Sequence, residues 1–163
     1  MSTTRFADAV TALIAAYQAA PALSGVPVYD GLTPQTGSDP EFVIVGHDGS
    51  LEADGTFVPD ALAGNYNQRQ IQMDPVNPSE ETGWVNCVLV CQSGDSADTA
   101  GRRARAAVLL AALEDAADAG GGYPAGVTGM TFDGTTDGRW IYRQSMAGVA
   151  VLVAYRVSYS TAW

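Results

Sequence analysis

The sequence predicts a single α+β domain of 163 residues, in which a mixed, mainly antiparallel sheet is packed by an N-terminal helix and one long central helix. Three observations predict this class. The apolar run from Trp84 to Cys91 has the length of a buried strand, and an Ala-rich segment without proline follows it. Residues 4–20 carry apolar residues at helical spacing. Near the end of the chain, apolar residues recur at every second position, which predicts a C-terminal β-hairpin.

The first third of the chain predicts one helix and two short strands. The helix over residues 4–20 is amphipathic, Thr3 or Thr4 can cap it, and Pro21 ends it. A strand over residues 26–29 contains a proline, which favours a sheet edge or a strand start. The apolar run EFVIVG at residues 41–46 predicts a buried strand. The apolar stripe of the helix consists of Phe6, Val10, Leu13, Ile14 and Tyr17.

Residues 47–65 predict a long loop rich in glycine and acidic residues. Its apolar side chains, among them Leu51 and Phe57, follow no helical or strand period. Connections inside a domain usually run about 4 to 6 residues, so a loop of this length is unusual. We therefore expect it to be an assembly element in which Leu51 and Phe57 contact another subunit or another protein of the assembly; the alternative is a surface excursion without such a role.

The middle of the chain predicts strand, turn and long helix. Residues 66–73 alternate weakly and indicate a half-exposed strand, and a Pro-rich loop precedes the buried strand that ends at Cys91. The long helix is predicted over residues 96–118, capped by Asp95 or Ser96 and stopped by three glycines at 120–122.

The C-terminal region predicts a strand over residues 127–132 and a hairpin with arms at 139–145 and 148–161, turning near Met146. The last arm keeps one apolar face as far as Tyr159, and Trp163 ends the chain. An exposed terminal indole is unfavourable unless something buries it. We therefore expect Tyr159 and Trp163 to pack outside their own chain, on an adjacent subunit or on a tube to which the subunits bind. The apolar face consists of Val149, Val151, Val153, Tyr155, Val157 and Tyr159.

The charge balance argues against several classes of function. The chain carries 18 acidic residues against 8 basic ones, for a net charge of −10. Affinity for nucleic acid needs clustered cations, so we expect no binding to the outside of DNA.

The hydrophobic pattern indicates neither a membrane span nor a signal peptide. No apolar run approaches the roughly 20 residues of a membrane span, and Asp8 and Gln18 interrupt any signal-peptide core.

Gly94-Asp95-Ser96 is the only sequence that resembles an active site, here the nucleophile block of GDSL-type esterases. A serine nucleophile needs a histidine base, and His47 is the only histidine, with no late Asp-x-x-His motif to supply one. Cys87 and Cys91 share one face of a strand about 13 Å apart, too far for a disulfide, and cannot complete a zinc site. We expect no catalytic, cofactor or metal site and two reduced core cysteines.

Three of the eight arginines, Arg102, Arg103 and Arg105, lie near the start of the long helix, and acidic residues lie near its end. Both placements oppose the helix dipole. A solvated helix face is one interpretation. The alternative is that both ends meet opposite charges on a neighbouring copy, which suits head-to-tail packing in a ring.

The order of these elements resembles the tail terminator proteins of long-tailed phages with non-contractile tails, especially those of actinobacterial hosts. The local elements that carry the resemblance are VPVYDG at 26–31, PEFVIVG at 40–46, the long helix and the terminal SYSTAW. The resemblance covers nearly the whole chain, 1–163, as one domain.

The resemblance implies a non-enzymatic virion protein, assembled in the host cytoplasm, that forms a six-membered ring and caps the tail tube. Its implied partners are further copies of itself, the tail tube protein and the head-completion or connector protein, with DNA passing through the lumen unbound. Two alternatives stay open: a head-tail connector or neck protein of similar size, and a small esterase.

Overall fold

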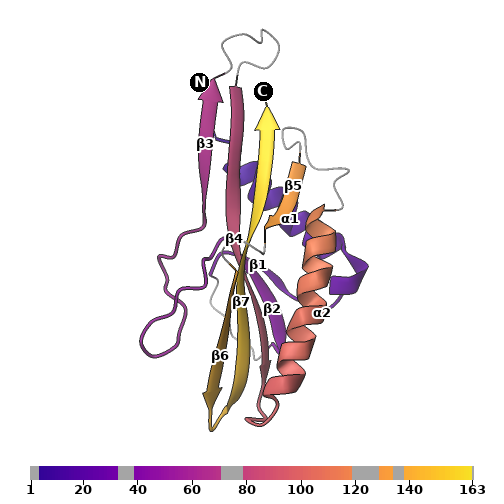
Figure 1. Ribbon diagram of the computed structural model, residues 1–163, viewed down its shortest axis with the longest axis vertical. Coiled ribbons are helices and arrows are strands. Elements are labelled where there is room, and N and C mark those ends of the chain that lie inside the picture. Colours follow the sequence, from indigo (N-terminus) through magenta and orange to yellow (C-terminus); the bar gives the residue numbers. More distant parts are fainter. Residues whose placement is uncertain (1–3, 33–38, 71–78, 119–128, 134–137, 163) are drawn as a thin grey trace.

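A computed structural model describes residues 4–32, 39–70, 79–118, 129–133 and 138–162. They form one sheet with two α-helices against it (Figure 1). The predicted α+β class is confirmed. The predicted glycine stop at 120–122 and Trp163 lie outside the described residues. The elements in chain order are α1 (Phe6–Ala19), a 3₁₀ turn (Pro21–Leu23), β1 (Val28–Asp30), β2 (Glu41–Val45), β3 (Gly64–Gln70), β4 (Ser79–Ser93), α2 (Thr99–Asp118), β5 (Gly129–Asp133), β6 (Arg139–Ser145) and β7 (Gly148–Ala162).

Two long antiparallel strands, β4 and β7, form the centre of the seven-stranded sheet. On the side of β4 that faces away from β7, β3 pairs with the first half of β4 and β2 pairs with its second half. β1 then pairs with the far side of β2. On the side of β7 that faces away from β4, β6 pairs with the first half of β7 and β5 pairs with its second half. Among the described strand pairs only β1 and β2 run parallel, and the other five pairs are antiparallel.

The predicted C-terminal hairpin is confirmed, with Ser145 opposite Gly148 at its turn. Gly148 has a φ of +143°, and a side chain there would meet the Ser93 carbonyl on the end of β4. A glycine is therefore required where the hairpin turn passes close to the neighbouring strand.

The main core lies between the helices and one face of the sheet, which we call the helix face. The alternation predicted for the last strand is confirmed, since Val151, Val153, Tyr155 and Val157 are buried on this face together with Leu109 of α2. A smaller apolar cluster lies on the opposite, outer face of the sheet. It contains Phe42, Ile44, Val88, Val90, Ala150 and Leu152.

Helix α2 begins at Thr99, three residues later than predicted. The carboxylate of Asp95 accepts a hydrogen bond from the backbone N–H of Ala97 at 2.9 Å, and the N–H of Asp98 bonds the Asp95 carbonyl at 3.1 Å. The expectation that Asp95 or Ser96 caps the long helix is thus wrong. These residues form a turn before the helix, because the Asp95 carboxylate accepts its hydrogen bond from Ala97 inside an Asx turn and not from an N–H group of the helix.

Residues 47–62 fold back onto the outer face of the sheet. Leu51 and Phe57 bridge each other as a small antiparallel pair and pack against the outer-face cluster. His47 is buried, with Nε2 2.8 Å from the Val58 carbonyl and Nδ1 accepting from the N–H of Gly49 at 2.9 Å. Sequence periodicity did not indicate this, because the apolar side chains are spaced by turns rather than by a regular element.

Candidate assembly surface

Glu81 on β4 forms a buried polar centre that joins three parts of the fold. Its carboxylate is fully buried and accepts hydrogen bonds from the Thr4 hydroxyl at 3.0 Å and the Arg5 backbone N–H at 3.0 and 3.2 Å. It also accepts from the Gln68 amide at 2.8 Å and the Tyr159 hydroxyl at 2.7 Å. Thr4 and Arg5 directly precede α1, so a carboxylate from the sheet binds the positive end of this helix.

The environment of Glu81 favours its charged form. Burial alone would raise the pKa of this carboxyl, but the hydrogen bonds from Gln68, Tyr159, Arg5 and Thr4 outweigh burial and leave the pKa lowered. Burial, followed by the bond to Glu81, raises the pKa of the Tyr159 phenol above its ordinary value. The pair therefore stays as carboxylate and neutral phenol at neutral pH.

Tyr159 lies in the core of its own chain, where only 3% of its surface is exposed. Its ring contacts Phe6 of α1 and covers Gly83 of β4, where an added side chain would meet the tyrosine ring at 2.9 Å. The structure therefore differs from the expectation that Tyr159 packs on an adjacent subunit. The reason is that α1 covers this end of the sheet, which the strand pattern alone did not indicate.

The three arginines of α2 have different surroundings. Arg105 forms a two-pronged ion pair with Glu41 of β2, at 2.7 and 3.0 Å, and this hydrogen bonding raises its pKa. Arg102 pairs with Asp98 one turn earlier, at 3.2 Å. Arg103 is exposed, and no ion pair of Arg103 is found with the residues that the structure describes. Of the three, Arg103 is therefore the one that is exposed without an ion pair to a described residue.

In the described part of the chain, no free histidine is found that could serve the Gly94-Asp95-Ser96 segment as the base of an esterase. Ser96 is exposed in the turn before α2, and both nitrogens of His47 are engaged by backbone groups of its own loop. Cys87 and Cys91 are buried and free, as predicted, and burial raises the pKa of Cys87 to about 12 and that of Cys91 to about 11. The described residues contain no group of three side chains placed to hold a metal ion.

Four described strands lie at the sides of the sheet, β1 and β3 on the β4 side and β5 and β6 on the β7 side. Of these, β3 and β6 are exposed on most of their length, and neither pairs with a further strand in the described part of the chain. Three large rings on these strands are nearly half exposed: Tyr66 (48%), Trp140 (43%) and Tyr142 (46%). Exposed sheet edges are usually blunted by charge, proline or a covering element. Open edges that also carry exposed rings are typical of surfaces that bind another chain.

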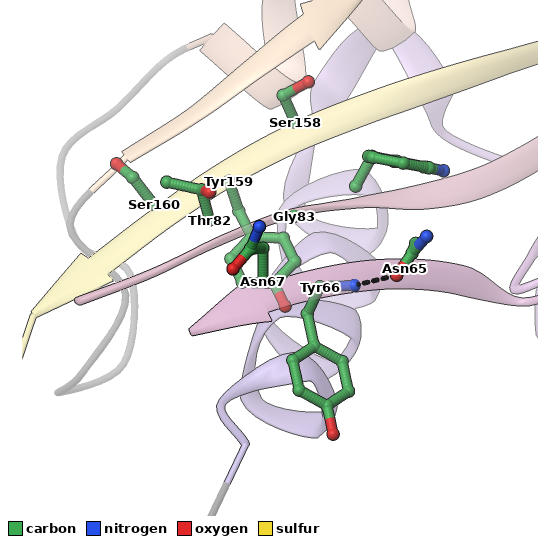
Figure 2. Close-up of a pocket in the computed structure, with 9 residues that line it drawn as sticks. Asn65, Tyr66, Asn67, Thr82, Gly83, Ser158, Tyr159 and Ser160 are labelled. Carbon is green, nitrogen blue, oxygen red and sulfur yellow. Dashed lines mark hydrogen bonds between the residues drawn. The ribbon is translucent and has the colours of Figure 1, made fainter. Parts of the chain in front are cut away.

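A polar groove of about 670 Å³ lies across the upper half of the sheet (Figure 2). Its floor consists of two cross-strand rows on the outer face, Asn65–Trp84–Ser158 and Asn67–Thr82–Ser160. Figure 2 shows Thr82, Ser158 and Ser160 on one side of the strands and the Tyr66 ring directed to the other. The guanidinium of Arg156 lies 4.7 Å from the centre of the Trp84 ring. The groove offers hydroxyls and amides but no chemically reactive group.

These features define a class, namely a two-layer α+β domain with two helices on one face of a mainly antiparallel sheet and exposed strand edges on both sides. Searches against protein-family models and against curated proteins find no match. Among solved structures, the chain is similar to a chain in the virion of a native gene transfer agent (GTA) particle. The two are 15% identical, with a TM-score of 0.53, over 94% of this chain and 93% of the other. At this identity the similarity establishes a shared fold.

No helix among the described residues is long and apolar enough to cross a membrane. Sequence reasoning missed the buried carboxylate of Glu81 and the three exposed rings of Tyr66, Trp140 and Tyr142. The alternation of residues 139–145 could have placed both rings of β6 on one face. Nothing in the sequence could have indicated that Glu81 is buried, because its partners lie up to 78 residues away.

Proposed function

We propose that this chain is a structural virion protein that caps a phage-type tail tube as a ring and joins it to the head-completion proteins. The observation that carries the proposal is the shared fold, over 94% of the chain, with a chain of a gene transfer agent virion. The order of the elements, which resembles the tail terminator proteins, supports the tail end as the position and six as the number of copies.

The physical features are compatible with this role. A growing tube ends in open strand edges, and a ring with matching edges can bind them and stop further addition. A chain with a net charge of −10 repels the phosphates of DNA that passes through the ring. Within the ring, Arg103 at one end of α2 and the exposed Glu114 and Asp115 at the other are available for ion pairs between neighbouring copies.

The test is deletion of the gene from the virus or particle-producing genome, followed by electron microscopy of the products. A terminator stops polymerisation, so its loss is expected to give tubes of uncontrolled length. Normal-length tails that fail to join heads would instead indicate the second candidate, a head-tail connector or neck protein. Normal infectious particles without the protein would contradict both.

A further inference from the structure

We infer that the β6 edge of one copy pairs with the β3 edge of the next copy, so that the sheets of neighbouring subunits continue into one another. The inference concerns the contact between copies and rests on the ring in the proposed function. It depends on three properties of the two edges, namely their position, their direction and the face on which their rings lie.

The two edges lie on opposite sides of the sheet. β3 pairs only with β4, and β6 pairs only with β7, so each leaves one side of its backbone without a strand partner in the described part of the chain. Opposite edges are what a head-to-tail contact between identical copies requires. Both strands are seven residues long, so either can pair along most of the other.

The direction of the strands also fits. Each step from β3 to β4, β4 to β7 and β7 to β6 is antiparallel, so β3 and β6 run in opposite directions within one copy. A neighbour placed edge to edge therefore adds an antiparallel pair like those already present. Because β3 and β6 border opposite halves of the long strands, copies joined in this way are staggered. A ring then closes with strands inclined to its axis, as in a barrel.

The exposed rings lie on the same face of the sheet. Tyr66 is paired across the strands with Gly83, which is paired in turn with Tyr159 of the helix face. Trp140 is paired with Val153 and Tyr142 with Val151, and both valines also lie on the helix face. Pairing of β6 with β3 brings the three rings together and covers them. Cross-strand aromatic pairs stabilise antiparallel sheets.

The charges of the two strands permit the contact. Although the chain has 18 acidic residues, neither strand contains one. Their arginines, Arg69, Arg139 and Arg143, lie on the outer face, away from the three rings. Arg139 and Arg143 already donate hydrogen bonds to the carbonyls of Asp48 and Gly55. Side chains alternate between faces, so the shared face places Tyr66 opposite residue 140, 142 or 144 and excludes residue 143.

The inference is tested by disulfide trapping between copies of the full chain. Tyr66→Cys protein is mixed with Trp140→Cys, Tyr142→Cys or Gln144→Cys protein under mild oxidation, since a disulfide needs Cα atoms within about 7 Å. We expect a crosslinked dimer in at least one mixture, and neither protein alone should give it. A double variant carrying both cysteines of that mixture should form a ladder of covalent oligomers.

Two controls keep the result interpretable. Arg143→Cys lies on the other face of the same strand and should not crosslink with Tyr66→Cys, and the buried Cys87 and Cys91 should give no crosslink in the unmodified protein. Dimers from either single variant alone, or no crosslink at concentrations up to about 100 µM, would overturn the inference. The gene-deletion phenotype is independent of these crosslinks, so the proposed function can fail or stand separately.

Discussion

Replacement of Glu81 by glutamine tests whether one buried carboxylate joins α1 to the sheet. Four groups donate to the two carboxylate oxygens, from Thr4, Arg5, Gln68 and Tyr159. An amide keeps one acceptor oxygen and directs two new N–H groups at these donors, so at least one donor loses its partner. Hydrogen bonds to a charged group contribute about 1.5–3 kcal/mol each, and an unsatisfied buried donor costs about 1–3 kcal/mol.

Gln68 can rotate its own amide and accept from the new side chain, which recovers part of the loss. We therefore expect Glu81→Gln to lower the free energy of unfolding by about 2–4 kcal/mol at pH 7. In a chain of this size each kcal/mol corresponds to roughly 2–4 °C in Tm. Glu80→Gln is the matched control, because Glu80 is only half buried and should change stability by less than about 0.5 kcal/mol.

The pH dependence gives a second readout. Because the pKa of Glu81 is lowered in the fold, its stabilisation is complete above the unfolded pKa of about 4.3 and is lost as the pH falls through the folded pKa. The difference between wild type and Glu81→Gln in urea unfolding should thus be largest at pH 7 and shrink below about pH 4. Equal stability of the two proteins at pH 7, or a difference that stays constant in acid, would refute the reasoning.

Three further predictions concern the turn, the loop and the C-terminal strand. Ser96→Ala should change the free energy of unfolding by less than about 0.5 kcal/mol, because Ser96 does not cap α2. Both the wild type and this variant should hydrolyse a chromogenic ester only at the background rate. Hydrolysis by the wild type that the variant abolishes would restore the esterase interpretation. Phe57→Ala should cost about 1–3 kcal/mol in urea unfolding, because Phe57 covers the outer-face cluster, and an unchanged midpoint would show that the loop is only loosely attached. Truncation after Val157 should unfold the chain by far-ultraviolet circular dichroism, because it removes the buried Tyr159; an unchanged spectrum would show that the strand end is dispensable for folding.

The class of fold could be predicted because the signals that determine it are local. The length and the β-branched content of the run from Trp84 to Cys91 favour a buried strand, and a proline-free Ala-rich segment after it favours a helix. The alternation of the last strand predicts its faces correctly as far as Tyr159. The start of α2 was misplaced because an Asx turn and a helix cap use the same residue types.

The contacts of the surface residues could not be predicted, because they depend on which distant segment covers which face. Tyr159 is buried beside α1, and Leu51 and Phe57 are partly buried against the outer face of the sheet. Arg105 is engaged by Glu41, 64 residues away. Each of these side chains looked unpartnered in the sequence because its partner is remote in the chain.

The continuous pairing of β4 with β7 has a mechanical consequence. Fourteen residue pairs, from Glu80 opposite Ala162 to Ser93 opposite Val149, connect the two strands without interruption. A force that slides one strand along the other loads all of these pairs at once, whereas a force that peels them apart breaks them one at a time. The domain should therefore be stiff along its long axis and should yield first at the lateral edges, where β3 and β6 each depend on a single neighbour.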